Sequence, residues 1–368
     1  MKSANGRFKT RTVSLLATAA TIGAMGLLGA GAAHAESGCL TAGTSGFTAA
    51  VVAHEGQTIA KRTVDATGCD VGIYVDSPGV TIDRVTVTGA NAAGILAQNT
   101  SHVIVSRSTI TGNGYHTVIP ASHESTNPGE LPQAFGISMF GVSHATISRN
   151  TVYDNGRGGI GVMDNGPFDP GQVVGTPPSS TVNVPVTDVT IERNKLWSNY
   201  AGCAIVVSAF NTGNTVSHVG ISRNTITQGS TPFGPTGPDV GGIVAQSNGV
   251  DSVVSDITIS RNSVSDSGEA GVIVHAAAPG SMTKDVLVER NVLSGNNWLL
   301  ASAPETAGVV VDSRLAPADL GQMNVNTVVT RNTMTAQFYG VWAQGPETPT
   351  VSRNDITVTA GGEAVHVQ

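Results

Sequence analysis

Two side chains able to perform acid–base chemistry stand at the same place in two copies of one apolar line. His275 ends the line "GVIVH" and Asp312 ends the line "GVVVD". If these copies form adjacent strands, their Cβ atoms lie about 5 Å apart, close enough for the side chains to bond. A carboxylate raises the pKa of a neighbouring imidazole and orients it, as a general acid or base requires. We predict His275 and Asp312 as catalytic residues, with a plain outward cross-strand pair as the alternative.

Side chains suited to ligand binding gather around this pair in the predicted arrangement. They are a cation two residues after Asp312, two glutamines at the matching place of neighbouring copies, and two nearby tryptophans: Arg314, Gln246, Gln344, Trp342 and Trp298. The guanidinium can neutralise an anionic group, and the indole rings can stack on a ligand. We predict these five as substrate-binding residues.

A second group of ionisable residues lies nearer the N-terminus and raises the question of a metal site. One insertion carries His116, His123, Glu124 and Glu130, and the segment after the next apolar line carries Asp164 and Asp169. Such side chains bind divalent cations, but their spacing matches no metal motif. We favour a solvated loop here, and we expect neither a metal nor an organic cofactor.

The elements that must position these residues are short strands that recur along the chain. The line "VTIERNKLWSNYAGCAIVV" (189–207) returns in variants such as "ITISRNSVSDSGEAGVIV" (257–274), and Arg331 and Arg353 of two successive copies are only 22 residues apart. Apolar residues alternate with a period of two inside each copy, which indicates strands. Three short strands and their corners fill one copy, so we expect the copies to stack as coils of a parallel β-solenoid.

One asparagine recurs at the same corner of each copy. We expect these residues to adopt left-handed backbone and to bond to one another as a ladder: Asn150, Asn194, Asn224, Asn262, Asn291, Asn332 and Asn354. The arginine before each of them would form a parallel column. We interpret that column as a solvated face rather than an anion-binding strip.

The strand of His275 belongs to a row of lines that begin with Gly-Ile, Gly-Val or Ala-Ile. We predict that the residue after the glycine points inward: Ile95, Ile137, Ile160, Ile205, Ile243, Val272, Val309 and Val341. The following outward row, from Leu96 to Trp342, is apolar. Inserted loops, another subunit or a ligand with an apolar face must cover it.

The Gly-Ile strands and the "RN-x-I" corners resemble those of the right-handed parallel β-helix superfamily of pectate-lyase-like proteins, over roughly residues 60 to 368. The resemblance implies an all-β fold, a right-handed parallel β-helix with three short strands per coil. That fold hosts lyases, hydrolases, epimerases and adhesins. The paired aspartates of its polygalacturonase-like hydrolases and the calcium-binding aspartates of its pectate lyases are missing from this sequence.

The two ends of the chain indicate how it is organised. Residues 1–35 have a basic start, an apolar stretch and the ending "AHA", which predicts a secretory signal peptide cleaved after Ala35. We expect an N-terminal cap segment over 36–62, the β-helix over 63–368, and a disulfide between Cys39 and Cys69. The last line, "EAVHVQ", leaves an open strand, so a homo-oligomer through this coil or through the apolar sheet face is one expectation.

The composition also bears on which classes of partner and function we expect. Charged residues make up 12% of the chain and the net charge is −7, without a basic stripe interleaved with aromatics, so we expect no nucleic-acid partner. No second apolar run after the signal peptide is long enough to cross a bilayer, so we expect no membrane span. The leading hypothesis is a secreted protein with lyase or epimerase chemistry on a polyuronate. The alternatives are a non-catalytic carbohydrate-binding or cell-surface protein, and an isomerase or cyclase acting on a less polar small molecule.

Overall fold

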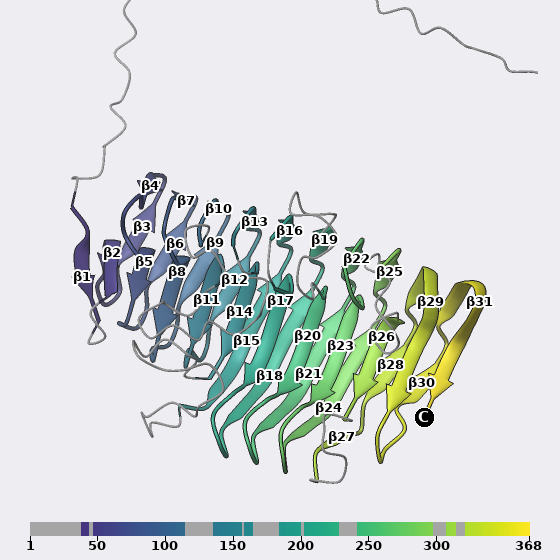
Figure 1. Cartoon of the computed structure of the whole chain (residues 1–368). Coiled ribbons are helices and arrows are strands. Elements are labelled where there is room, and N and C mark those ends of the chain that lie inside the picture. Colours follow the sequence, from purple (N-terminus) through teal and green to yellow (C-terminus); the bar gives the residue numbers. More distant parts are fainter. Residues whose placement is uncertain are drawn as a thin grey trace, which may run out of the picture. The chain divides into compact units, whose positions relative to one another are not determined.

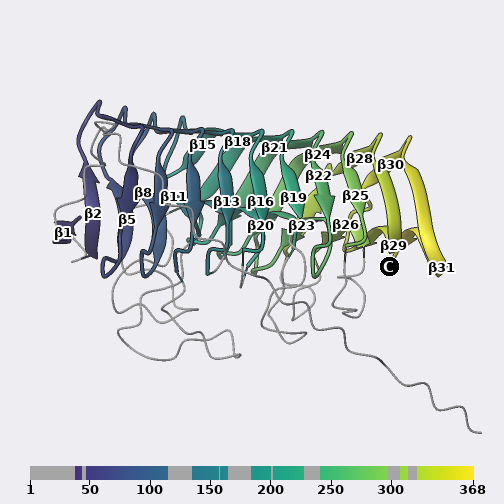
Figure 2. The same cartoon turned by 90° about the horizontal axis from the view of Figure 1, so that it is seen from above.

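The computed structural model describes residues 38–368 apart from 44–46, 115–134, 157, 165–183, 200–201, 228–240, 297–306 and 314–320. Within these residues the secondary structure consists of strands and turns, and the strands stack as successive coils (Figures 1 and 2). Each coil has three faces, which we call first, second and third. This is the right-handed parallel β-helix that the sequence predicts.

The first face is a continuous parallel sheet whose strands come before the asparagine corner of each coil. Its described strands are β3 (Thr58–Ala60), β6 (Thr81–Asp83), β9 (Ile104–Ser106), β12 (Thr146–Ser148), β15 (Val186–Glu192), β18 (Thr215–Ser222), β21 (Val253–Ser260), β24 (Met282–Glu289), β27 (Met323–Val325), β28 (Val328–Thr330) and β30 (Thr350–Ser352).

The second face consists of three-residue strands that follow the asparagine corner. Its described strands are β4 (Thr63–Asp65), β7 (Thr86–Thr88), β10 (Thr109–Thr111), β13 (Thr151–Tyr153), β16 (Lys195–Trp197), β19 (Thr225–Thr227), β22 (Ser263–Ser265) and β25 (Val292–Ser294). Each pairs in parallel with the equivalent strand of the next coil.

The third face carries the predicted site. Its described strands are β2 (Phe47–Ala53), β5 (Val71–Val75), β8 (Ala93–Gln98), β11 (Ile137–Phe140), β14 (Ile160–Met163), β17 (Ile205–Ala209), β20 (Ile243–Ser247), β23 (Val272–Ala276) and β26 (Ala307–Asp312). In the last two coils, β29 (Thr333–Gln344) and β31 (Asp355–Val367) run through both the second and the third face.

The N-terminal end of the helix is closed by a short strand and a disulfide. Strand β1 (Leu40–Ala42) pairs antiparallel with β2, and Cys39 is bonded to Cys69 as predicted, with the Cα atoms 5.5 Å apart. Strands β2 and β3 pair in parallel with β5 and β6, so the first coil begins inside segment 36–62. No helix in the described residues is long and apolar enough to cross a membrane.

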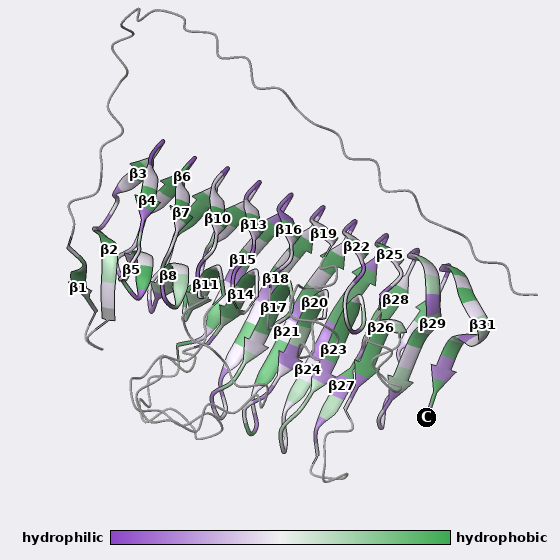
Figure 3. Cartoon of the chain, turned by 45° about the horizontal axis from the view of Figure 1, so that its top comes forward, coloured by the Kyte–Doolittle hydropathy of each residue, from purple (hydrophilic) through white to green (hydrophobic). Residues whose placement is uncertain are grey.

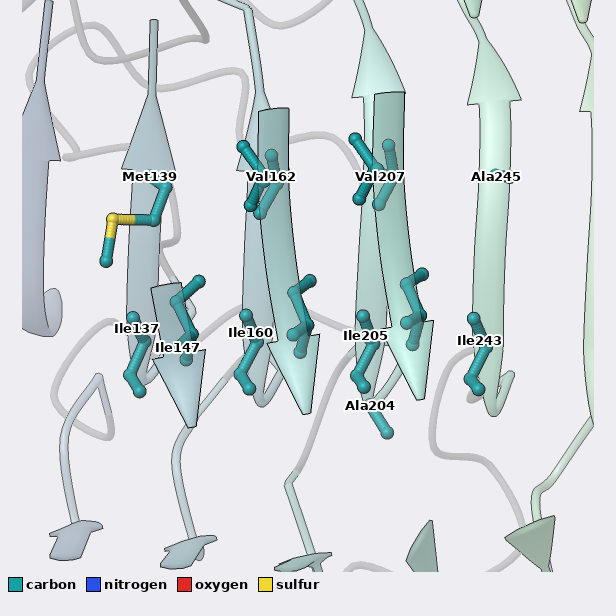
Figure 4. Packing of buried hydrophobic residues seen from close by; sticks show 14 of the residues in the cluster. Ile137, Met139, Ile147, Ile160, Val162, Ala204, Ile205, Val207, Ile243 and Ala245 are labelled. Carbon is teal, nitrogen blue, oxygen red and sulfur yellow. The ribbon is translucent and has the colours of Figure 1, made fainter. Parts of the chain in front are cut away.

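Aliphatic rows fill the interior between the three faces. The predicted inward row of the third face is confirmed, because every residue from Ile95 to Val341 in it is fully buried. Figure 4 shows two of these rows, with Ile137, Ile160, Ile205 and Ile243 stacked from coil to coil. Since a fully buried aliphatic side chain contributes about 1.5–3 kcal/mol, such rows dominate the stability of the fold.

The asparagine ladder is confirmed. From Asn150 to Asn354, each side-chain amide donates to the side-chain carbonyl of the next asparagine over 3.0 Å. The predicted backbone was wrong, however: the arginine before each asparagine is left-handed, with φ of 56° at Arg193. The asparagine is buried and its amide is held by its neighbours, whereas the arginine side chain can extend into water.

A second, shorter ladder stands at the corner between the second and third faces. Asn113 donates to Asn155 over 3.0 Å, and Asn155 donates to Asn199 over 2.9 Å. Each of these three residues lies five positions after the first-ladder place of its coil, as in Asn194 and Asn199. Sequence reasoning missed this ladder, although the five-residue spacing was a visible signal.

Candidate functional site

The candidate site lies on the outward side of the third face, where four polar side chains follow one another. Strand register places Gln246 beside His275, His275 beside Asp312, and Asp312 beside Gln344. Neighbouring strands in such a sheet are about 4.8 Å apart. The predicted adjacency of His275 and Asp312 is therefore confirmed, while their catalytic role stays a prediction.

Strand alternation explains why these side chains point outward. Val272 and Val274 on β23 are fully buried in the interior, so the intervening and following residues face out. Val309 and Val311 fix Asp312 on β26 in the same way. Because β-branched residues have few rotamers and pack tightly here, the strands hold the polar row on a rigid base.

His275 and Asp312 differ in how far they are exposed to water. His275 is half-buried, whereas the Asp312 residue is only 4% exposed. Part of the imidazole therefore reaches the surface of this face, although its Nε2 atom is buried, while the carboxylate lies mostly beneath the surface. This arrangement suits an acid–base residue backed by an orienting carboxylate.

One hydroxyl that the sequence did not single out supports the end of β23. The Thr283 hydroxyl donates to the His275 carbonyl over 2.6 Å and lies 2.9 Å from the Ser247 hydroxyl. Thr283 comes from β24 on the first face, so it reaches the site across the interior of the coil. No pattern within the line of His275 could have indicated this contact.

The apolar outward row beside the polar one is covered by the chain itself. Leu96 is fully buried, Val206, Val244 and Val310 are nearly so, and Trp342 is 1% exposed. Trp342 packs with Ala270, Ala307 and Val310 as one small cluster. The indole therefore forms part of the base of the site.

Phe135 shows how one part of this cover is built. A Cβ atom added to Gly161 in the outward row would meet the Phe135 ring at 2.5 Å. The Phe135 backbone N–H donates to the Ser138 hydroxyl over 3.1 Å, which fixes the ring's segment over the sheet. The glycine leaves room for the ring, so a residue that comes just before β11, the neighbouring strand, covers β14 there.

Two of the predicted ligand-binding residues, Arg314 and Trp298, lie outside the described residues. So do most members of the second ionisable group, namely His116, His123, Glu124, Glu130 and Asp169. In the part of the chain that the structure describes, no three His, Cys, Asp or Glu residues are grouped so as to hold a metal ion.

Asp164 is the described member of that second group, and it holds a turn. Its carboxylate accepts hydrogen bonds from the backbone N–H groups of Phe210 and Asn211 over 2.7 and 2.8 Å, and from the Asn214 amide over 3.0 Å. Burial raises the pKa of this carboxyl to about 6, although the three hydrogen bonds act in the opposite direction. These contacts assign Asp164 to the connection between β17 and β18.

The coils, the ladders and the parallel register define a fold class, the right-handed parallel β-helix. A family model described as "Right handed beta helix region" matches residues 48–220. No curated protein matches the sequence.

Solved structures of similar fold have diverse activities in their names. The A-module of the mannuronan C-5 epimerase AlgE6 of Azotobacter vinelandii is 18% identical with a TM-score of 0.56, covering 84% of this chain and 70% of its own. A polygalacturonase of Erwinia carotovora ssp. carotovora is 9% identical with a TM-score of 0.50, covering 86% and 85%. The surface protein and adhesin PfbA of Streptococcus pneumoniae is 12% identical with a TM-score of 0.50, covering 84% and 77%. At these identities the likeness establishes the fold.

Proposed function

We propose that this protein is secreted and acts on an extracellular polyuronate, with acid–base chemistry at His275. The observation that carries the proposal is the register of β20, β23, β26 and β29, which lines up a half-buried imidazole, a mostly buried carboxylate and two flanking amides. The epimerase and polygalacturonase among the similar structures support a carbohydrate substrate. The disulfide supports an oxidising location outside the cytoplasm.

The chemistry assigns a distinct task to each residue. His275 removes the proton from C5 of a uronate, and Asp312 orients the imidazole and stabilises its charged form. Gln246 and Gln344 donate hydrogen bonds to sugar hydroxyls, while Arg314 neutralises the uronate carboxylate. In a lyase, the C5–H electrons form a C4–C5 double bond as the C4–O bond breaks. In an epimerase, a proton returns to C5 from the opposite face.

Deuterium uptake at C5 tests both outcomes in one experiment. The protein is incubated in D2O with polymannuronate or polygalacturonate, and the polymer is analysed by NMR for deuterium and by ultraviolet absorbance for unsaturated ends. His275→Ala should lower the rate by at least about a hundredfold, as removal of a general base does, without lowering the melting temperature. Asp312→Asn should cost less, because it misorients the base rather than deleting it.

His218→Ala is the matched control. His218 is also a strand histidine, but it lies exposed on the first face next to the Thr187 and Ser217 hydroxyls. Its loss should leave deuterium uptake unchanged. Full activity of His275→Ala would contradict the assignment of this residue as the base.

A non-catalytic carbohydrate-binding protein is the second candidate. The burial of Trp342 and Asp312 favours it, since both offer little surface to a reacting sugar. The adhesin among the similar structures is consistent with this class. Polyuronate binding without any deuterium uptake by the wild-type protein would support this candidate and exclude the first.

A further inference from the structure

A single row of cations runs along the corner between the first and second faces, away from the third face that carries His275. Among the described residues, this row holds ten of the chain's 19 Lys and Arg residues: Lys61, Arg84, Arg107, Arg149, Arg193, Arg223, Arg261, Arg290, Arg331 and Arg353. The backbone N–H of each of the first nine donates to the residue before the next cation, over 3.0–3.3 Å. The ten rungs are therefore in register, one per coil, and the corners along the upper edge appear hydrophilic in Figure 3.

The backbone at these rungs does not explain the choice of residue. All ten cations have φ between 52° and 58°, a region in which glycine and asparagine are less strained than arginine. Left-handed backbone also occurs at two other places in the coil, where it is occupied by varied residues, such as Gly79, His144 and Asp256 five residues before a cation and Asp154 and Ala336 five residues after one. The fold accepts many residue types at positions with left-handed backbone, so the uniform charge of this row has another cause.

Electrostatics oppose the row as well. Neighbouring rungs carry like charges at strand spacing, about 4.8 Å at the backbone, which destabilises the fold. Three acidic side chains each contact two rungs: Asp83 with Arg84 and Arg107, Glu192 with Arg193 and Arg223, and Glu289 with Arg290 and Arg331. Within the described residues Arg149, Arg261 and Arg353 form no ion pair. An excess of positive charge therefore remains along the edge.

The guanidinium groups remain accessible despite these contacts. The arginine side chains in the ion pairs are 43–50% exposed. At Asp83, burial raises the pKa of the carboxyl, but hydrogen bonds from Arg107, Ser106 and Arg84 outweigh it and lower the pKa to about 2. That acid stays charged and bridges its two rungs across the whole physiological range.

Hydroxyl groups border the row on both sides. The residue before each cation is most often serine, as at Ser106, Ser222 and Ser352, and the residue two positions after it is most often threonine, as at Thr109 and Thr225. These side chains can bond to sugar hydroxyls. Neither bordering row contains an aromatic residue, whereas surfaces for single-stranded nucleic acid need aromatic stacking platforms.

In place of the solvated face that the sequence favours, we propose that this row binds an extended, linear polysaccharide with a carboxylate on every sugar, laid along the axis of the solenoid. An extended chain of uronates carries carboxylates at regular intervals along its length, so several of them can pair with guanidiniums of the row at once. The planar guanidinium matches a carboxylate with two parallel hydrogen bonds. This surface is separate from the third face, and it holds the polymer whether or not His275 acts on it.

Binding of the full chain to immobilised polygalacturonate tests the proposal, with uncharged dextran as the reference surface. The variant Arg149→Asn, Arg223→Asn and Arg261→Asn removes three charges at corners where asparagine is well tolerated. Affinity at low salt should fall about tenfold, since each of three exposed ion pairs contributes a factor of about two. The salt dependence should also become shallower, because fewer counterions are released. The melting temperature should not fall.

The same coils supply a matched control at another left-handed position. His144→Asn, His218→Asn and Asp256→Asn each lie five residues before one of the three arginines and share its left-handed backbone. This control variant should bind like the wild type. Arg→Lys at the three test positions keeps the charge but loses the paired hydrogen bonds, so its affinity should lie between those of the wild type and the Arg→Asn variant.

Three outcomes would overturn the proposal. One is wild-type binding to polygalacturonate no tighter than to dextran, and another is equal binding by the Arg→Asn variant and its control. The third is equally tight binding of single-stranded DNA, which would show that the polymer's sugars are not recognised. His275→Ala should leave this binding intact. Failure of the cation row to bind polymer and failure of the proposed chemistry at His275 are therefore measured separately.

Discussion

Replacing Asn224 by alanine should destabilise the protein far more than loss of one polar side chain usually does. The Asn224 amide donates to the Ile191 carbonyl and to the Asn262 side chain, both over 3.0 Å. Its carbonyl oxygen accepts from the backbone N–H of Asn194 over 2.9 Å and from the Asn194 amide over 3.0 Å. Asn224 is only 1% exposed, so these four hydrogen bonds are shielded from water.

The magnitude follows from what each partner loses. The Asn194 backbone N–H is left buried without its acceptor, which costs about 1–3 kcal/mol, and three further hydrogen bonds are lost at about 0.5–1.5 kcal/mol each. Some partners keep other bonds: the Asn194 amide still donates to the Ile147 carbonyl. We therefore expect a loss of about 3–5 kcal/mol in the free energy of unfolding, measured by urea denaturation.

Asn354→Ala is the comparison that isolates burial. Asn354 accepts two hydrogen bonds from Asn332 and donates one to the Val329 carbonyl, but it is half-exposed, so water can replace these bonds. This variant should lose about 1–2 kcal/mol. Equal losses for Asn224→Ala and Asn354→Ala, or a loss below about 1 kcal/mol for Asn224→Ala, would refute the role assigned to the buried ladder.

Two further predictions concern the interior and the pH dependence. Ile243→Asp should destabilise the protein by about 4 kcal/mol or more, because an unpaired carboxylate would lie between Ile205 and Val272; an unchanged melting temperature would disprove the register. The pKa of Asp164 rises from 3.8 to about 6 on folding, so folding favours its protonated form. That contribution is complete below about pH 4 and is lost as the pH rises through about 6, costing about 3 kcal/mol. Urea midpoints at pH 4 and pH 7 should therefore differ more in the wild type than in Asp164→Asn; an identical difference would contradict the shift.

The inward rows and the first asparagine ladder could be predicted because both are strictly periodic. Ile205 and Ile243 occupy the same place in the same short line, and a period of two leaves one choice of inward face. Register between neighbouring coils then follows, and with it the adjacency of His275 and Asp312. The chemistry of that pair remains a hypothesis, because adjacency alone is shared by structural and catalytic pairs.

Other features depend on contacts that no local pattern contains. The left-handed backbone falls on Arg193 rather than Asn194, because burial of the amide and solvation of the guanidinium decide between two adjacent polar residues. The cover over the apolar row depends on residues such as Phe135, which lies over Gly161 from another coil. The support of His275 by Thr283 likewise crosses the interior between two faces.

The way the rows are built also determines how the protein can change in length. Each rung of the asparagine ladder, of the cation row and of the aliphatic interior bonds mainly to the coil on either side, and the corners meet at the same three places in each coil. Excision of one whole coil, such as residues 225–262, would bring Asn224 next to Asn291 and leave every row continuous. Stability in such a stack is roughly a sum over coils and their nearest-neighbour contacts. Gain or loss of coils by recombination within the gene would therefore lengthen or shorten a surface row without changing the residues of the remaining coils.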